Sequence, residues 1–461
     1  MSNSDRIEEL RRRVIKINSV SPTFCIAKWK QSTTTLYNGM THSCHHPVQH
    51  KIDLEQLNHS VTALHNTPVK IAAREQMLDG VQPAECDYCW NIENLGLGHF
   101  SDRHYKSANA GLGLWQTFDE VVASGTGPEI NPAYLEIAFE NICNFKCSYC
   151  SPDVSSRWTE EIEHHGPYVL ADGHRQHDLV WLRESGRFPI HHSAPNPYIE
   201  KFWQWWPSLY ESLDTFRITG GEPLLSENTW KIIDWVRAHP RPDFKLIINT
   251  NMGVPRRLIE RLCEAVRDLD GKIANFSIAT SAESTGAAAE YSRWGLKWQT
   301  FTDNVQYFFK NTPSTAHISF MTTVNVLSVG TFADFLRFLL DLRARYDLDR
   351  RCSRTNFSIS YLRWPAHQCL VHLPPAIKQK FALSCAQVAA EGAPDDARLD
   401  TFYLEETQQL QRLIDFMNSR EPDPSSQKNF VTFFKEYDRR RGCSLSDTFP
   451  ELHSLIEAGT S

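Results

Sequence analysis

The stretch YLEIAFENICNFKCSYC, residues 134–150, decides the fold prediction because a strand-like run passes directly into three closely spaced cysteines. The run Tyr134–Phe139 is apolar without clean alternation, as expected of a strand that is covered on both faces. Cys143, Cys147 and Cys150 follow it on a predicted strand-to-helix loop. In α/β folds the chemistry lies at the carboxyl ends of the strands. The sequence therefore predicts a functional site at the end of this strand.

After about residue 131, short β-rich runs alternate with amphipathic helical patterns such as Glu227–His239 and Thr331–Tyr346. Alternation of this kind, repeated about six times, predicts an α/β fold whose parallel sheet is open or closed into a partial barrel. The predicted strands are Tyr134–Phe139, Thr215–Thr219, Lys245–Asn249, Ala274–Thr280, His317–Val324 and Asn356–Leu362.

The same patterns predict three regions along the chain. Residues 20–130 form a small cysteine-rich module, residues 131–365 form the barrel, and residues 366–461 form a helical C-terminal region. The irregular segment 166–197 is interpreted as an excursion between the first two strands, either a lid or a surface insertion.

Composition narrows the class of protein. The 461 residues carry a net charge of −7, with 41% hydrophobic and 22% charged residues, which indicates a soluble globular chain. The acidic balance gives no support for binding nucleic acid, and no apolar run reaches the ~18 residues of a membrane span. The charged N-terminus lacks the pattern of a secretion signal, so we expect a cytoplasmic protein. Its twelve cysteines are then reduced, which points to metal binding or catalysis.

Cys143, Cys147 and Cys150 place three thiolates within eight residues. Such a group suits a soft metal centre, because a short loop can wrap one corner of it. A structural zinc site needs four ligands, whereas a cubane iron–sulfur cluster held by three cysteines keeps one iron open. The spacing alone leaves zinc as the alternative.

The CxxxCxxC pattern resembles the signature of the radical S-adenosylmethionine (SAM) enzymes. The resemblance implies a partial (β/α)6 TIM-like barrel and a [4Fe–4S] cluster whose open iron binds SAM. Cleavage of SAM then yields a 5′-deoxyadenosyl radical that abstracts a substrate hydrogen. Further motifs on successive strands are similar to those that bind SAM in this family. They are Tyr149 for the adenine, Gly220, Gly221 and Glu222 for the amino group, Asn249, Thr250 and Asn251 for the ribose, and Ser277 and Arg293 for the carboxylate.

Each of these motifs also has a structural interpretation. The GGEP sequence suits a turn, the Asn/Thr group suits a helix cap, and Arg293 suits a surface salt bridge. Their order on successive strand ends favours the SAM site.

A second group of cysteines precedes the barrel. Cys25, Cys44, Cys86 and Cys89 can fully ligate one more metal, and their segment resembles the auxiliary-cluster module of SPASM/twitch proteins. The resemblance implies a second [4Fe–4S] cluster, with tetrahedral zinc or an unmetallated site as alternatives. The nearby histidines are either ligands or surface groups; they are His42, His45, His46 and His50.

The remaining cysteines are assigned to packing or left without a role. Cys263 and Cys385 lie on the apolar stripes of predicted helices, so we expect both in the core. Cys352, Cys369 and Cys443 lack the paired spacing of metal ligands.

The predicted function is a radical SAM enzyme with an auxiliary cluster for electron transfer. About 24 residues precede Cys25, which leaves no obvious peptide-recognition domain and favours a small metabolite, sugar or nucleotide as substrate. The alternatives are a peptide-modifying maturase, a non-catalytic iron–sulfur or zinc scaffold, and a zinc hydrolase. Expected partners are the substrate and an electron donor such as flavodoxin or ferredoxin, without a membrane or nucleic acid.

Overall fold

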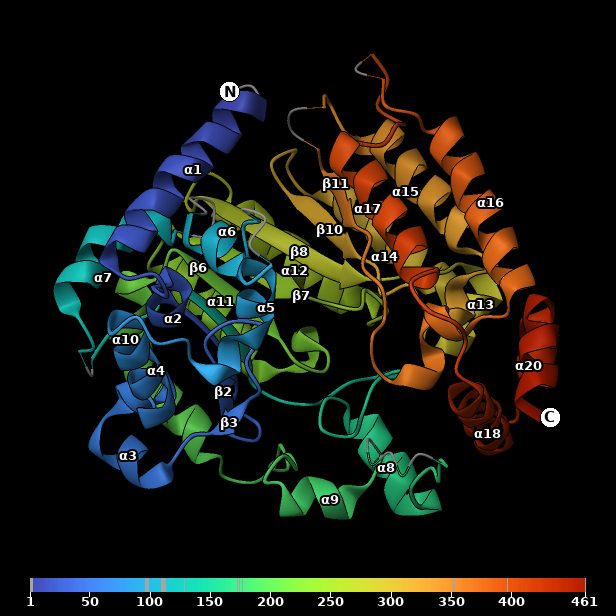
Figure 1. The fold of residues 1–461 in the computed structure, drawn as a ribbon, viewed down its shortest axis with the longest axis horizontal. Helices are drawn as coiled ribbons and strands as arrows, with labels where there is room; N and C mark the ends of the chain where they lie inside the picture. The colour runs from blue at the N-terminus through green and yellow to red at the C-terminus, as the bar shows by residue number, and fades with distance from the viewer. Residues whose placement is uncertain are drawn as a thin grey trace. The chain divides into compact units, whose positions relative to one another are not determined.

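A computed structural model describes most of the chain (Figure 1). The described residues are 3–95, 99–108, 113–127, 129–171, 173, 175, 177–350, 353–395 and 397–460. The chain divides into two compact units. Unit 1 comprises Met1–Asn141, Pro189–Gly220 and Arg241–Ile247, and unit 2 comprises Ile142–Phe188, Gly221–Pro240 and Ile248–Ser461.

Unit 1 contains a mixed sheet in the order β6-β4-β1-β2-β3. Strand β4 pairs in parallel with β1 and with β6, whereas β2 is antiparallel to β1 and to β3. Strands β4 and β6 match the sequence prediction, while the three N-terminal strands were not predicted. The bounds are β1 Gln31–Thr35, β2 Met40–His42, β3 His50–Lys51, β4 Tyr134–Ala138 and β6 Thr215–Thr219.

The helices of unit 1 start at residues that suit helix N-termini. Helix α4 begins at Pro68 after Thr67, whose side chain accepts from the Lys70 N–H, and α10 begins at Pro197 after the capping residue Asn196. These helices are α1 Asn3–Val20, α2 Ile26–Lys30, α3 Leu54–His59, α4 Pro68–Leu78, α5 Asp87–Glu93, α6 Asp102–Ala108, α7 Phe118–Ser124 and α10 Pro197–Ser212.

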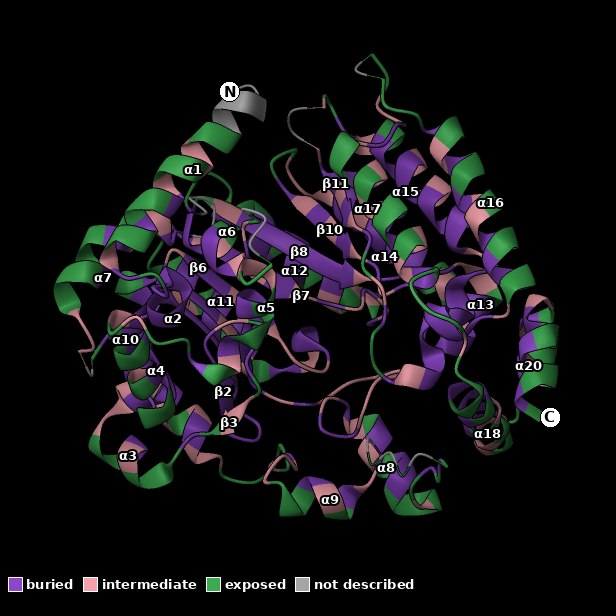
Figure 2. Cartoon of the chain, in the orientation of Figure 1, coloured by how far each residue is buried: buried purple, intermediate pink, exposed green. Residues whose placement is uncertain are grey.

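Unit 2 contains three parallel strands in the order β11-β10-β8. Strand β8 is buried along most of its length, as the purple colour in Figure 2 shows. A separate antiparallel pair joins β5 to β9. Strand β7, Lys245–Asn249, has its first three residues in unit 1 and its last two in unit 2. The other bounds are β5 Lys146–Cys147, β8 Asn275–Ser281, β9 Arg293–Trp294, β10 His317–Met321 and β11 Thr355–Ser358.

Unit 2 also holds long amphipathic helices. Along α12 the residues Ile259, Leu262, Cys263 and Val266 recur at helical spacing and are all buried. The helices are α8 Ser156–His165, α9 Leu179–Glu184, α11 Glu227–Ala238, α12 Arg256–Leu269, α13 Gly286–Ser292, α14 Trp298–Asn311, α15 Phe332–Tyr346, α16 Pro375–Glu391, α17 Leu404–Met417, α18 Pro424–Arg441, α19 Leu445–Thr448 and α20 His453–Thr460.

The α/β class predicted from the sequence is confirmed by these parallel strands and their helices. Closure into a partial barrel, a separate cysteine-rich module and the three region boundaries stay predictions. Within the described residues, we find no helix with the length and apolar character that a membrane crossing requires.

Candidate functional site

The three-cysteine loop lies in unit 2, directly after the end of β4. Cys147 belongs to β5 and lies opposite Arg293 of β9. The Cys150 N–H donates to the Cys147 carbonyl at 2.9 Å, and the Phe145 N–H donates to Cys143 Sγ at 3.4 Å. Local hydrogen bonds therefore fix the loop on both sides of Cys147.

Burial raises the pKa of each thiol in this loop, that of Cys143 to about 12. The metal-free loop therefore holds neutral thiols, and a bound metal must displace their protons. Soft thiolate donors on one short loop fit an iron–sulfur cluster chemically.

No group of three or more His, Cys, Asp or Glu side chains in the described part of the chain is arranged to hold a metal ion. A cubane takes one thiolate on each ligated iron, so its ligands do not converge on a single ion. This loop also offers three thiols, one fewer than the four ligands of a structural zinc site, so its donor set suits a cluster better.

Gly220 and Glu222 follow the end of β6. Gly220 has φ +119°, and a Cβ there would lie 2.7 Å from the Glu140 carbonyl oxygen, so only glycine fits. Glu222 is buried, and its carboxylate accepts from the N–H groups of Leu224 at 3.0 Å and Asn251 at 2.6 Å. Burial raises the pKa of Glu222 to about 7. Gly221 lies between Gly220 and Glu222 and is the first residue of the segment Gly221–Pro240 of unit 2.

Asn251, which follows β7, contacts the three-cysteine loop. Asn249 is the last residue of β7. Asn251 donates from Nδ2 to Oδ1 of Asn144 at 2.8 Å and accepts from the Gly253 N–H at 2.8 Å. Asn144 in turn donates to the Gly253 carbonyl at 3.0 Å. The Asn251 amide therefore ties two strand-end loops together in this structure.

Ser277 does not lie at a strand end. It is the third residue of β8 and pairs with His317 of β10, whereas the carboxyl end of that strand is Ser281. The structure thus does not bring Ser277 to the edge that carries the strand-end groups.

Glu283 lies just beyond the carboxyl end of β8, where Ser277 was expected to lie. Its role was not predicted from the sequence. Its carboxylate binds Arg293 through two contacts, Nε–Oε1 at 3.2 Å and Nη2–Oε2 at 2.5 Å. It also accepts from the Tyr149 hydroxyl at 3.1 Å, and the Arg293 guanidinium lies 5.5 Å from the Tyr149 ring centroid. Arg293 Nη1 lies 4.0 Å from Cys147 Sγ. The predicted residues Tyr149 and Arg293 are therefore brought together beside the loop.

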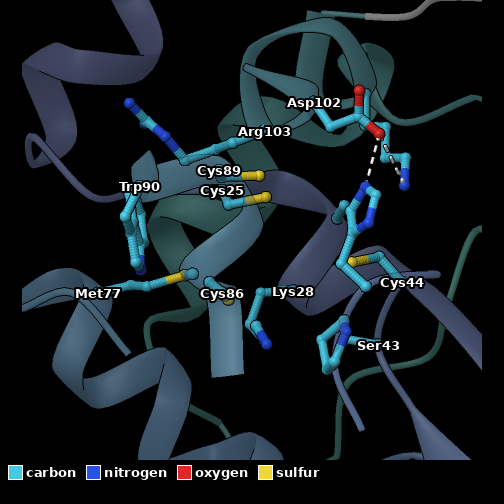
Figure 3. Close-up of a pocket in the computed structure, with 14 residues that line it drawn as sticks. Cys25, Lys28, Ser43, Cys44, Met77, Cys86, Cys89, Trp90, Asp102 and Arg103 are labelled. Atoms are coloured by element: carbon cyan, nitrogen blue, oxygen red, sulfur yellow. Dashed lines mark hydrogen bonds and ion pairs between the residues drawn. The ribbon is translucent and has the colours of Figure 1, made fainter. Parts of the chain in front are cut away.

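The four N-terminal cysteines line one pocket in unit 1 (Figure 3). Cys25 precedes α2, Cys44 follows β2, Cys86 ends a short 3₁₀ helix and Cys89 lies in α5. In Figure 3 the sulfurs of Cys25 and Cys89 point toward the side of the pocket where the Cys44 sulfur lies. Four soft donors around one pocket fit a fully ligated cluster, and they also fit zinc.

The nearby histidines are engaged with other groups. His46 Nε2 bonds Oδ2 of Asp102 at 2.7 Å, and His50 Nε2 bonds the Thr67 hydroxyl at 2.8 Å. His42 Nδ1 contacts the Cys44 carbonyl. His45, unlike these three, is exposed at the surface. These contacts favour the cysteines as ligands.

Helix α6 and Ser101, the residue before it, supply further contacts to the thiols. The Ser107 hydroxyl accepts from the Ile26 N–H at 3.0 Å and donates to Cys25 Sγ at 3.7 Å. Hydrogen bonds from the Arg103 N–H and the Ser101 hydroxyl lower the pKa of Cys89, although burial raises it overall to about 11. Hydrogen bonds to sulfur tune an iron–sulfur cluster, so α6 belongs to the site although its sequence lacks a metal motif.

The remaining described cysteines are either buried or hydrogen-bonded to a neighbouring side chain. Cys263, Cys369 and Cys385 are buried, and Cys443 donates to Oδ1 of Asp438 at 3.3 Å. The expected core positions of Cys263 and Cys385 are confirmed. Cys352 lies outside the described residues.

Comparisons with known proteins include a distant relative that is similar to part of the chain. No protein-family model matches the chain. Over 147 residues the chain is 27% identical to the GTP 3′,8-cyclase of Sulfurimonas denitrificans, a radical SAM enzyme. The match covers 32% of this chain and 35% of the relative, so the chain spans about a third of the length of the curated protein that it matches. This similarity supports the radical SAM superfamily as the family of the chain.

Proposed function

We propose that this chain is a radical SAM enzyme with two [4Fe–4S] clusters. Cys143, Cys147 and Cys150 hold the SAM-binding cluster, and Cys25, Cys44, Cys86 and Cys89 hold the auxiliary one. The observation that carries the proposal is a loop of three half-buried thiols, with Arg293 Nη1 4.0 Å from Sγ of the middle one. Three thiols leave one iron of a cubane without a protein ligand, which is where SAM binds in the family that the sequence resembles.

The chain's own residues then bind and orient SAM. The buried Glu222 carboxylate accepts from the ammonium group, which it attracts once it is ionised. Asn249 bonds the ribose and Tyr149 packs on the adenine. Arg293 Nη1 donates to the SAM carboxylate, while Glu283 fixes the other side of the guanidinium.

The cluster and SAM, once bound, supply a 5′-deoxyadenosyl radical for hydrogen abstraction from an unactivated C–H bond. The protein orients the substrate carbon and excludes water. Because four thiols line the auxiliary pocket, the second cluster is fully ligated and acts in electron transfer rather than in substrate binding.

We further propose a small metabolite, sugar or nucleotide as substrate and a flavodoxin or ferredoxin as electron donor in the cytoplasm. The name of the relative, GTP 3′,8-cyclase, adds support for a nucleotide. The closely related alternative is a SPASM/twitch-type maturase that modifies a peptide.

Anaerobic reconstitution tests the proposal. Iron and sulfide are quantified, and the protein is then incubated with SAM and dithionite. We expect about eight irons per chain and release of 5′-deoxyadenosine. About four irons with retained zinc would exclude the auxiliary cluster. A full iron content without 5′-deoxyadenosine would leave a non-catalytic scaffold.

A further inference from the structure

The C-terminal turn of α18 carries three consecutive arginines that differ sharply in burial. The Arg439 side chain is 61% exposed, whereas Arg440 and Arg441 are 2% and 1% exposed. Gly442 ends the helix in the left-handed conformation, with φ 62° and ψ 36°. Two guanidinium groups are therefore held inside unit 2, where a charge persists only if partners surround it.

Arg441 is surrounded by aromatic rings and one carboxylate. Its Nη2 lies 2.7 Å from Oε2 of Glu161, and its Nη1 donates to the Tyr168 hydroxyl at 2.9 Å. The guanidinium carbon lies 3.5 Å from the centroid of the Tyr437 ring and 5.1 Å from that of Trp158. Stacking of this closeness fixes the side chain in one orientation.

Two of these partners, Glu161 and Trp158, contact Cys147 or the residue next to it. Glu161 binds Nζ of Lys146 at 2.5 Å, and Lys146 is the neighbour of Cys147 in β5. Trp158 donates from Nε1 to the Cys147 carbonyl at 2.9 Å. On the other strand of the pair, the Trp294 ring centroid lies 5.8 Å from the Arg441 guanidinium. Arg441 therefore contacts β9 itself and reaches β5 through single residues.

The charges at this place do not balance. Glu161 lies within 4 Å of three cations, Lys146, Arg440 and Arg441. The second nearby carboxylate, Glu436, binds Arg440 at 2.7 Å and is shared with Arg439. Lys146 and Arg439 are partly exposed, at 22% and 61%, while Arg440 and Arg441 are buried. The charge next to β5 is therefore positive in sum, and an iron–sulfur cluster with three thiolates would supply the opposite charge.

We propose that Arg441 is a positioning residue for the SAM-binding cluster. It holds the strand that carries Cys147 against its partner strand and supplies positive charge that stabilises the reduced, more negative cluster. This inference rests on the proposed function, because it presumes a cluster on Cys143, Cys147 and Cys150. It assigns a role to the RRRG segment that no metal or SAM motif explains.

The test is a redox titration of reconstituted protein, followed by electron paramagnetic resonance at low temperature. Arg441→Gln removes the buried charge, so the midpoint potential of the SAM-binding cluster should become more negative. Arg439→Gln on the same helix turn removes an exposed charge and should leave that potential unchanged. Arg441→Lys keeps the charge and should retain most of the wild-type potential.

The auxiliary cluster in unit 1 is the internal reference, and its potential should not move in any of the three variants. Equal potentials of Arg441→Gln and wild type would overturn the proposal, as would an equal shift of both clusters. If Arg441→Gln does not fold, Arg441→Lys decides: it keeps the charge, so a clear shift of its SAM-cluster potential away from the wild-type value would contradict the inference. A wild-type protein that binds no cluster at Cys147 instead refutes the proposed function.

Discussion

Arg293 and Glu283 form a doubly bonded ion pair whose side chains are 6% and 0% exposed. The pair uses Nε and Nη2 of Arg293 and leaves Nη1 on the side of Cys147 Sγ. Glu283 therefore decides which edge of the guanidinium faces the three-cysteine loop.

Replacement of Glu283 by Gln should lower the free energy of unfolding by about 3–5 kcal/mol, because it leaves the buried Arg293 charge without its counterion. Chemical denaturation of the metal-free protein measures the change. Glu391→Gln is the matched control, since Glu391 also binds an arginine, Arg337, through two contacts but is 43% exposed. The control should cost much less, because solvent screens an exposed ion pair. Equal losses in the two variants would contradict this reading of the pair.

The affinity of the reconstituted protein for SAM should rise with pH. The pKa of Glu222 is raised to about 7 by burial, so a proton competes with the ammonium group below that pH. The dissociation constant should fall up to about tenfold per pH unit below pH 7 and level off above it. Glu222→Gln should bind SAM weakly and lack this dependence, whereas Glu227→Gln, at an exposed position, should behave as wild type.

The raised pKa of Glu222 also makes stability depend on pH, and stability should fall where the affinity for SAM rises. The folded protein holds the Glu222 proton up to about pH 7, whereas the unfolded carboxyl ionises near its model value of 4.5. The free energy of unfolding of the metal-free protein should therefore fall as the pH rises from 4.5 to about 7. If Glu222→Gln shows the same decline as wild type, another group is responsible.

Ser107→Ala should make the potential of the auxiliary cluster more negative while four irons stay bound there. The change removes an O–H···S bond to Cys25, and such bonds stabilise the reduced cluster. Redox titration with separate signals for the two clusters measures the effect. Ser107→Thr keeps the hydroxyl and should restore the wild-type potential. A shift as large in the threonine variant would point to packing instead.

Cys147→Ala should reduce the iron content from about eight to about four per chain and abolish release of 5′-deoxyadenosine. Cys263→Ala should retain all the iron and the activity, because Cys263 is fully buried in α12 among apolar residues. Iron analysis and product chromatography give both readouts. If the two variants lose iron alike, the division between cluster ligands and core cysteines is wrong.

The six strands that the sequence predicted are present because each is an apolar run bounded by turn residues. Strand β1, QSTTT, escaped prediction because it is entirely polar yet entirely buried. Ser32 of β1 accepts from Lys70 Nζ at 2.8 Å, and Thr41 of the neighbouring strand β2 accepts from the same ammonium group at 2.8 Å. Local patterns cannot report such a network, since its members lie 29 and 38 residues from Lys70 in the chain.

In the candidate site too, some residues could be predicted from local sequence patterns and others could not. Contiguous motifs identified the cysteines, Glu222 and Arg293. Their partners Glu283, Ser107 and Arg441 carry no motif, because each acts through contacts with residues distant in sequence. Ser277 was selected by its resemblance to a polar position near the SAM carboxylate in the radical SAM family, and the structure places it as the third residue of β8.

Arg441 contacts Glu161, although 280 residues separate them in the chain. This separation has a consequence for biosynthesis. A nascent chain that has emerged as far as α6 already contains all four thiols of the unit 1 pocket and Ser107. The loop around Cys147 stays without its Arg441 contacts until translation has passed residue 441. In the two-cluster protein proposed above, the auxiliary thiols are therefore synthesised long before the last contacts of the loop around Cys147.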